Sequence, residues 1–287
     1  MHTWRKILEL SCGYLESHSV PDAMVAAELL MARLVKSSRG FLSSHLEKTP
    51  SKNLVDAMRR GIARLAAGEP VQYVLGEWDF RSLTLKCDKR ALIPRPETEE
   101  LVTRVLKFAA SRSFDAPPFV VDVGTGSGCI ILSLAKEMAS GAFLGVDISP
   151  DAISLAKENA DLCNLSGKVK FAIADGLDDF DEPGIIDVIV SNPPYITSED
   201  CKTLDPRVRD WEPVSALDGG ASGLDFYERL STDAFNLLKP NGAVFFEIGD
   251  GQGEDVRQIL FESGFDKISI EKDYAGHDRY ACAILPG

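Results

Sequence analysis

The 287-residue sequence contains no apolar stretch of membrane-spanning length, and its first residues lead into a mixed, Glu-containing segment instead of the apolar core of a signal peptide. The six cysteines stand singly, without a Cys-x-x-Cys pair and without a histidine at zinc-ligand spacing. The sequence therefore predicts neither secretion, nor a membrane segment, nor a metal site. We expect reduced, packed thiols in a cytoplasmic protein.

Basic residues are few: 31 Lys and Arg stand against 44 Asp and Glu, which gives a formal net charge of −13. Such a surface repels phosphate backbones, so an enzyme acting on nucleic acid would have to confine its positive potential to one patch. We therefore expect no direct nucleic-acid partner. The length and the 45% of hydrophobic residues suffice for one large or two modest domains with a sizeable core.

Apolar residues recur at helical spacing through the first 67 residues, as at Leu54, Met58 and Ile62. Breaks that carry serine, proline or glycine divide this part at residues 19–22, 37–40 and 49–51. We therefore expect a small helical bundle, with Pro21 in the first turn of one helix and Ser51 as the N-cap of another.

The chain then changes character. Residues 78–85 alternate between apolar and polar side chains, which is typical of a strand, so we expect a hairpin linker over residues 76–95. This linker joins a helical domain of residues 1–75 to a larger domain of residues 96–287, which opens with a helix ending near Ala110.

From residue 119 onward, short apolar runs rich in β-branched residues alternate with helical patterns. This alternation is typical of parallel strands that are covered by helices on both faces. The expected strands are residues 120–123, 142–146, 169–173, 188–190 and 244–248. The predicted fold class is α/β, a doubly wound, Rossmann-like sheet whose ligands bind at the carboxyl ends of the strands.

The first of these strands leads into a glycine-rich turn with the sequence Asp122-Val123-Gly124-Thr125-Gly126-Ser127-Gly128. The glycines permit a tight turn and a close approach of the backbone to a ligand, and the helix expected from about Cys129 presents free N–H groups. Taken alone, this glycine turn (residues 122–128) fits a nicotinamide enzyme, an S-adenosylmethionine (SAM) enzyme or a plain connection between a strand and a helix.

The next two strands each end in an acidic residue. Asp147 comes about 20 residues after the glycine turn, where a carboxylate can accept hydrogen bonds from both ribose hydroxyls. Its alternative role, as a helix N-cap, is better filled by Ser149, which precedes Pro150. Asp175 can accept from an adenine amino group while the Gly176 backbone flanks the ring, although aspartate is also a common turn residue. The three strand ends together favour a ligand that contains a nucleoside.

SAM suits this predicted site better than a nicotinamide dinucleotide does. Asp122 heads the turn, and further dinucleotide-specific features are absent from the sequence. The glycine turn also lacks Lys and Arg, which methyl transfer does not need because no phosphate has to be held. A Rossmann oxidoreductase remains the minor alternative.

The most specific motif is the tetrapeptide Asn192-Pro193-Pro194-Tyr195, which follows the fourth expected strand. Prolines carry no N–H group, so the side-chain carbonyl of Asn192 and the backbone carbonyl of Pro193 can both face a substrate NH₂ group as acceptors. Tyr195 offers a face on which a planar group can stack. We name residues 192–195 the acceptor turn; the alternative is a rigid turn with a packed tyrosine.

The acceptor turn suits methylation of a nitrogen whose lone pair is delocalised, as in an adenine amine or a carboxamide. Two acceptors on the hydrogens of this nitrogen favour the pyramidal, electron-rich geometry of the transition state, and an in-line methyl group adds the effect of proximity. No strong base is required, because the nitrogen becomes acidic as its bond to methyl forms. The two turns together predict SAM-dependent N-methylation, with S-adenosylhomocysteine as the second product.

With these motifs, nearly the whole chain resembles the HemK/PrmC family, the glutamine N5-methyltransferases that modify bacterial class I peptide chain release factors. Besides the two turns, the resemblance is carried by Gly68-Glu69-Pro70-Val71-Gln72-Tyr73, Ile93-Pro94-Arg95-Pro96-Glu97-Thr98-Glu99, Trp211-Glu212-Pro213, Ala216-Leu217, Gly219-Gly220, Glu247-Ile248-Gly249 and Ala275-Gly276-His277-Asp278-Arg279. The Asn-Pro-Pro-Tyr motif alone is shared with adenine-N6 DNA methyltransferases, whereas the Ile-Pro-Arg-Pro-Glu-Thr-Glu segment is much narrower.

The resemblance implies that residues 96–287 form a SAM-dependent methyltransferase domain. It also implies that residues 1–75 dock the protein substrate; the alternative is that residues 1–75 only stabilise the protein. It implies that SAM is bound by Gly124, Thr125, Gly126, Ser127, Gly128, Asp147, Asp175, Gly176 and Asn192. It implies that Asn192, Pro193, Pro194 and Tyr195 hold the glutamine amide of the Gly-Gly-Gln motif. Some family members carry an aromatic residue where Gly176 stands, so only backbone contact with adenine is expected there.

Three other functions remain to be distinguished. A DNA adenine-N6 methyltransferase flips its base into a comparable pocket but should carry a basic target-recognition region, which the acidic composition disfavours. A ribosomal-protein glutamine methyltransferase would use the same chemistry on another partner. A SAM- or nucleotide-sensing module would need no acceptor turn. The residues His277-Asp278-Arg279 are interpreted as a structural or substrate-edge cluster, since this methyl transfer needs no histidine base.

Overall fold

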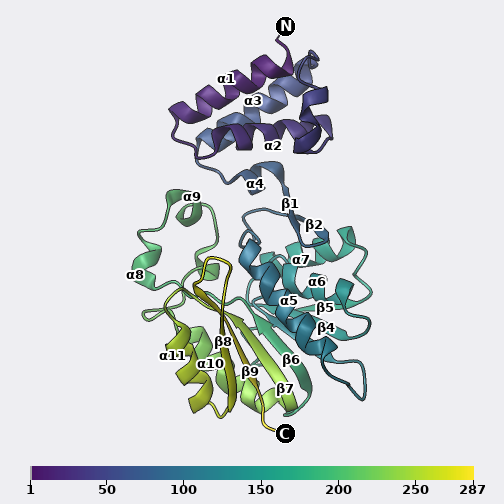
Figure 1. Cartoon of the computed structure of the whole chain (residues 1–287), viewed down its shortest axis with the longest axis vertical. Coiled ribbons are helices and arrows are strands. Elements are labelled where there is room, and N and C mark those ends of the chain that lie inside the picture. Colours follow the sequence, from purple (N-terminus) through teal and green to yellow (C-terminus); the bar gives the residue numbers. More distant parts are fainter. Residues whose placement is uncertain (1) are drawn as a thin grey trace. The chain divides into compact units, whose positions relative to one another are not determined.

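The computed structural model describes residues 2–287, which form two compact units (Figure 1). The first unit ends at Glu77 and also includes Asp205–Trp211, and the second comprises Trp78–Leu204 and Glu212–Gly287. The hairpin segment expected as a linker therefore belongs mainly to the second unit. The three-part division at residues 75 and 95 remains a prediction.

The first unit is helical, as the spacing of its apolar residues predicts. Its elements are α1 (Trp4–Ser17), α2 (Ala23–Val35), the short 3-10 helix η1 (Arg39–Ser44), α3 (Lys52–Ala66), α4 (Val71–Leu75) and, from the later segment, α9 (Pro206–Arg209). Ser51 caps α3 as expected, since its hydroxyl accepts from the Leu54 N–H. Pro21 does not lie in the first turn of α2 but in the turn before it, because Asp22 is the N-cap.

The second unit contains a seven-stranded sheet with the strand order β5-β4-β3-β6-β7-β9-β8. The parallel strands are β3 (Phe119–Val123), β4 (Ala142–Asp147), β5 (Val169–Ile173), β6 (Ile186–Ser191) and β7 (Leu238–Glu247). The five expected strands are thus confirmed. Two strands that the sequence analysis did not identify, β8 (Lys267–Lys272) and β9 (Asp278–Ile284), continue the sheet, and β9 pairs antiparallel with β7.

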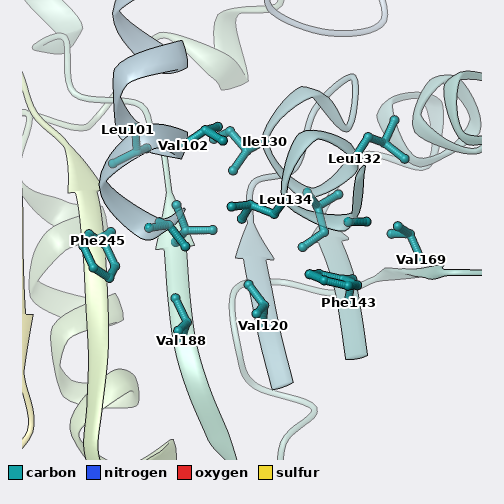
Figure 2. Packing of buried hydrophobic residues seen from close by; sticks show 14 of the residues in the cluster. Leu101, Val102, Val120, Ile130, Leu132, Leu134, Phe143, Val169, Val188 and Phe245 are labelled. Atoms are coloured by element: carbon teal, nitrogen blue, oxygen red, sulfur yellow. The ribbon is translucent and has the colours of Figure 1, made fainter. Parts of the chain in front are cut away.

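Helices cover both faces of this sheet (Figure 1). They are α5 (Pro96–Ala110), α6 (Cys129–Glu137) and α7 (Pro150–Leu162) on one face, with α10 (Asp225–Leu237) and α11 (Gly253–Glu262) on the other. Successive side chains along a strand point to opposite faces. Accordingly Val120, Val188 and Phe245 pack under α5 and α6 (Figure 2), whereas Val121 and Ile189 pack under α10 and α11.

The remaining elements, which lie mainly in the second unit, are short. Strands β1 (Glu77–Phe80) and β2 (Leu83–Lys86) pair as a two-stranded sheet, and Phe80, Leu83 and Leu85 join the core under α5 and α6. The segment after β6 carries α8 (Ser198–Cys201) and the 3-10 helix η2 (Val214–Ala216). Of the helices within residues 2–287, none is both long and apolar enough to cross a membrane.

Candidate active site

The predicted site residues gather at the carboxyl ends of β3, β4, β5 and β6, the edge at which doubly wound sheets bind their ligands. One pocket of the second unit is lined by Gly124, Thr125, Gly126, Ser127, Asp147, Asp175, Gly176, Asn192, Pro193 and Pro194. Two predicted residues, Gly128 and Tyr195, are not among its lining residues. Both expected turns therefore contribute to a single pocket.

The glycine turn requires glycine for two different reasons. At Gly124 the φ of +71° is one that other residues rarely adopt, and because a Cβ atom there would meet no other atom within 4 Å, the space beside the backbone is open to a ligand. At Gly128, where φ is +82°, a Cβ atom would lie 3.1 Å from Leu132 and 3.3 Å from Ala156. Gly128 therefore allows α6 and α7 to pack closely, whereas Gly124 fits the cofactor-binding role predicted for it.

Asp122 supports the glycine turn from within the core. Its Oδ2 atom accepts a 2.6 Å hydrogen bond from the Thr125 hydroxyl, and burial raises the pKa of the carboxyl to about 7. Among the described residues, its Oδ1 atom has no hydrogen-bond partner. Asp122 is thus held against the turn in an environment that penalises its charge.

Asp147 connects the ends of two strands. Its Oδ2 atom accepts from the Gly126 N–H and its Oδ1 atom from the Ser149 N–H, each at 2.9 Å, while burial raises the pKa of the carboxyl. Each carboxylate oxygen has a second lone pair, so ribose hydroxyls can still donate to Asp147. Ser149 is the N-cap of α7, as predicted, and Pro150 is the first residue of that helix.

Asp175 is paired with an arginine that the sequence analysis did not single out. Nη1 of Arg229, on α10, donates to Asp175 Oδ1 at 2.8 Å, and Nη2 donates to the Asp175 backbone carbonyl. A Cβ atom on Gly176 would lie 2.6 Å from Nη2 of the same arginine. Arg229 therefore occupies the space that a side chain at position 176 would need, and Asp175 retains Oδ2 as an acceptor for an adenine amine.

Three arginines line the pocket, and each is paired with a carboxylate of the second unit. Arg229 binds Asp175, Arg95 binds Glu212 at 2.5 Å, and Arg90 binds both Asp88 and Glu158. These pairs were not foreseen, because the glycine turn itself carries no Lys or Arg. The positive charge that they bring to the pocket wall is balanced locally.

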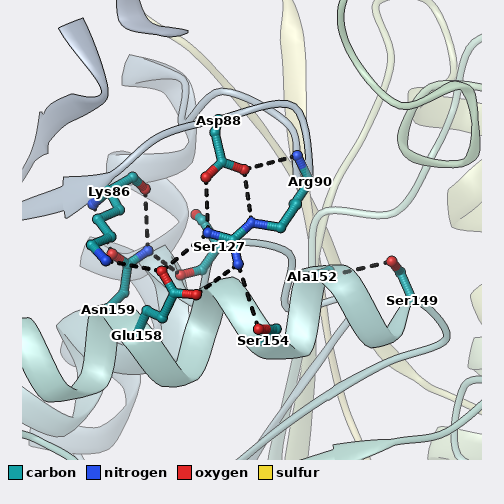
Figure 3. Close-up of polar contacts among 9 residues, drawn as sticks. All are labelled: Lys86, Asp88, Arg90, Ser127, Ser149, Ala152, Ser154, Glu158 and Asn159. Atoms are coloured by element: carbon teal, nitrogen blue, oxygen red, sulfur yellow. Dashed lines mark hydrogen bonds and ion pairs between the residues drawn. The ribbon is translucent and has the colours of Figure 1, made fainter.

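Figure 3 shows how Arg90 and a neighbouring asparagine fix the loop after β2 to α7. Hydrogen bonds from Arg90, followed by those from Lys86, lower the pKa of Glu158 to about 2. Buried Asn159 accepts from the Lys86 N–H at 2.7 Å and donates to the Ser127 carbonyl at 2.9 Å. Asn159 thus attaches the glycine turn to α7, a role that only the folded structure reveals.

The acceptor turn begins where β6 ends. Ser191 anchors this end, since its hydroxyl donates to the Val123 carbonyl at 2.6 Å. Tyr195 is held by its backbone, because its carbonyl accepts from Gln252 Nε2 at 3.0 Å. Burial raises the pKa of the Tyr195 phenol to about 12, so this side chain stays neutral over the physiological range.

A second loop packs directly on the acceptor turn. The Ile196 N–H donates to the Leu217 carbonyl at 3.0 Å, and the Gly219 N–H donates back to the Ile196 carbonyl at 2.8 Å. A Cβ atom on Gly219 would lie only 2.7 Å from the Pro194 carbonyl oxygen, so this close approach requires glycine. The Ala216-Leu217 and Gly219-Gly220 motifs therefore support the acceptor turn.

Behind the half-buried Asn192 lie two buried polar residues. Asn192 Nδ2 donates to Thr98 Oγ1 at 3.2 Å, and Thr98 Oγ1 donates to Glu247 Oε2 at 2.7 Å. Burial raises the pKa of Glu247 to about 7. No sequence pattern predicted a role for Thr98 or Glu247, although both lie in motifs that carry the family resemblance.

The cluster His277-Asp278-Arg279 lies outside the pocket lining. His277 is 3.1 Å from Asp250, and Arg279 donates to the Ile248 carbonyl at 2.8 Å. These contacts fix the end of β7 and agree with the structural interpretation of the cluster.

Comparisons with protein families match both units. The model of the PrmC N-terminal domain matches residues 6–76, and that of a methyltransferase domain matches residues 119–268. A release factor glutamine methyltransferase of Geobacter sulfurreducens is 36% identical over 282 residues, which cover 96% of this chain and 95% of the relative. Its counterpart in Agrobacterium fabrum is 39% identical over 268 residues, which cover 92% and 91%.

Solved structures show the same fold at low identity. The hMettl16 catalytic domain matches 77% of this chain and 81% of its own, with a TM-score of 0.57 and 20% identity. A methyltransferase from Pyrococcus furiosus matches 72% of this chain and 90% of its own, with a TM-score of 0.51 and 17% identity. These two matches establish the methyltransferase fold of the second unit.

Proposed function

Because the chain belongs to the family of release factor glutamine methyltransferases, we propose that it methylates the side-chain amide nitrogen (N5) of the glutamine in the Gly-Gly-Gln motif of bacterial class I release factors. SAM is the methyl donor, and S-adenosylhomocysteine is the second product. Since release factors act in translation, the proposed location is the cytoplasm, and no direct contact with nucleic acid is part of the proposal.

The observation that carries this proposal is the shared pocket of the glycine turn and the acceptor turn. The glycine turn, with Asp147 and Asp175, suits the nucleoside end of SAM. Asn192 and Pro193 present acceptor groups for the two hydrogens of a primary amide, and Pro193 and Pro194 bring no competing N–H group.

When SAM is bound, its sulfonium supplies an electrophilic methyl group. The substrate nitrogen forms a bond to this carbon, the carbon–sulfur bond breaks, and the electron pair returns to sulfur. The acceptors of Asn192 and Pro193 stabilise the developing positive charge on the N–H groups, and the nitrogen then loses one proton to water. Because the bond to methyl makes the nitrogen acidic, the turn has to orient the amide rather than deprotonate it beforehand.

We also propose that the helical unit docks the release factor. A groove between α1 and α3 is lined by apolar side chains, including Leu10 and Tyr14, which are 54% and 47% exposed. Tyrosine is a typical anchor for a protein partner, and neighbouring exposed apolar side chains mark protein interaction sites. The match of residues 6–76 to the N-terminal domain model of this family supports this role.

The proposal is tested by incubating the protein with labelled SAM and, in parallel, an intact release factor, duplex DNA and ribosomal protein. Mass spectrometry of the products should locate one methyl group on the glutamine of the Gly-Gly-Gln motif. Methylated adenine, or a methylated ribosomal glutamine with an untouched release factor, would refute the assignment. A Gly-Gly-Gln peptide should react far more slowly than the intact factor, because remote contacts help to orient the loop.

A further inference from the structure

Two buried polar side chains and the half-buried Asn192, from distant parts of the second unit, form one chain of hydrogen bonds. Asn192 Nδ2 donates to Thr98 Oγ1 at 3.2 Å, and Thr98 Oγ1 donates to Glu247 Oε2 at 2.7 Å. Thr98 is 2% exposed and Glu247 is 1% exposed, so water does not compete for the bond between them. Asn192 and Thr98 also line the pocket.

The number of hydrogen atoms that these three side chains can donate fixes the orientation of the Asn192 amide. A carboxylate can only accept hydrogen bonds, and a threonine hydroxyl has only one hydrogen to give. Since that hydrogen goes to Glu247, Thr98 can only accept from Asn192. The NH₂ group of Asn192 must therefore face Thr98, and its carbonyl oxygen lies on the other branch of the planar amide.

We propose that Thr98 and Glu247 are positioning residues that select the orientation of Asn192 in which its carbonyl oxygen is available to the substrate nitrogen, and that protonation of Glu247 reverses this selection. The inference rests on the proposed function, because it requires that Asn192 accepts a hydrogen bond from a substrate amide. It also gives the Ile-Pro-Arg-Pro-Glu-Thr-Glu segment a task in the reaction, through its threonine.

The same count of donors permits the reversal. A protonated Glu247 has an O–H group of its own and can donate it to Thr98 Oγ1. The Thr98 hydroxyl then donates to Oδ1 of Asn192, and the amide turns its NH₂ group away from Thr98. Two NH₂ groups would then meet in the pocket, so Asn192 would no longer accept from the substrate.

The surroundings of Glu247 place this change near neutral pH. Burial raises the pKa of its carboxyl to about 7, against the lowering effects of the Thr98 hydrogen bond and of Arg279 and Arg95. The titratable and charged groups that face Glu247 from the neighbouring elements are Arg95, Glu97, Cys129, Tyr195, Tyr227, Arg279 and Tyr280. Because the ionised form selects the productive orientation, methyl transfer should fall as pH falls through the pKa of Glu247.

The first test compares Thr98→Val with Thr98→Ser. Valine has the shape of threonine without the hydroxyl, so kcat for release factor methylation should fall by about 10-fold or more while SAM affinity and KM change little. Serine restores the hydroxyl and should restore most of kcat. Thr103→Val is the matched control, because Thr103 lies on the same helix and its hydroxyl bonds Arg81 and the Glu99 carbonyl instead.

The second test is the pH profile of Glu247→Gln. Glutamine does not titrate, so the acid limb of kcat should disappear in this variant and persist in Thr103→Val. A Glu247→Gln variant that keeps the wild-type acid limb, or a Thr98→Val variant with wild-type kcat, overturns this inference alone. A wild-type protein that methylates no release factor overturns the proposed function and this inference together.

Discussion

At the scale of single residues, the proposed site depends on side chains that each serve two neighbours. Asp147 holds the glycine turn through the Gly126 N–H and the start of α7 through the Ser149 N–H, and it is also the proposed ribose acceptor. A change at this position therefore alters both ligand contacts and the shape of the turn.

We predict that Asp147→Ala weakens SAM binding by about 1–3 kcal/mol, because a charged acceptor of several hydrogen bonds is lost. Isothermal titration calorimetry measures the effect. Asp151→Ala, which removes an exposed carboxylate from the first turn of α7, is the control and should bind SAM normally. Unchanged SAM affinity in a folded Asp147→Ala variant would contradict the assignment.

Asn192→Ala should lower kcat for methyl transfer by about two orders of magnitude, because its acceptor acts mainly in the transition state. The stability of the fold should change much less. Steady-state kinetics with the intact release factor provide the measurement, and exposed Asn236→Ala on α10 is the matched control. Normal turnover at saturating concentrations of both substrates would rule out the role of the acceptor turn.

The burial of Glu247 also leads to a prediction about the stability of the folded protein. Its pKa is raised from 4.5 to about 7 in the folded protein, so the stability it contributes is present below about pH 4.5 and is lost as pH rises through 7. As the pH rises from about 5 to about 8, the free energy of unfolding of Glu247→Gln should therefore increase by about 2–3 kcal/mol relative to that of the wild type. Urea unfolding at both pH values measures this gain; an unchanged difference between the two proteins would show that Glu247 titrates normally.

Site residues that are adjacent in the sequence could be predicted, whereas those that meet only in the folded protein could not. The glycine turn and the acceptor turn are contiguous motifs, so their chemistry could be inferred directly, and the family predicted from them is confirmed by the comparisons. Thr98 and Asn192 are 94 residues apart, and Thr98 and Glu247 are 149 residues apart. Which of many buried polar residues meet depends on the packing of α5 against the sheet, which no local pattern specifies.

At the scale of elements, the strands that the sequence predicted differ in composition from those that it did not predict. The parallel strands inside the sheet are apolar because helices cover them on both sides, and this composition made them visible in the sequence. Strand β8 lies at the edge of the sheet, and Lys267, Ser269 and Glu271 on it are exposed. A polar edge strand of this kind resembles a loop in composition, although its alternation is a usable signal.

The helical unit provides a prediction of its own. The double variant Leu10→Lys and Tyr14→Ser should raise KM for the intact release factor by about 10-fold or more, because two exposed anchors of the α1–α3 groove are lost. SAM affinity and the reaction with a Gly-Gly-Gln peptide should stay unchanged. Phe41→Ser is the control, since Phe41 is 73% exposed on η1 and does not line the groove. A wild-type KM in the double variant would contradict docking at this groove.

At the scale of the whole molecule, charge is distributed unevenly between surface and pocket. The chain carries a formal net charge of −13, which disfavours nucleic-acid substrates. Within the pocket, however, Arg90, Arg95 and Arg229 meet Asp88, Glu158, Glu212 and Asp175 in ion pairs. The acidic surface therefore does not make the pocket wall itself strongly acidic.

These paired arginines bear on how the protein should respond to ionic strength. Salt weakens attraction between separated, exposed charges, whereas hydrogen bonds at contact distance are screened little. SAM should therefore bind with nearly the same affinity at about 50 mM and about 500 mM NaCl, with a change of less than about threefold. Calorimetry at both concentrations tests this. A steep loss of affinity with salt would mean that the surface charge of the whole molecule, and not the contacts at the strand ends, attracts the cationic donor.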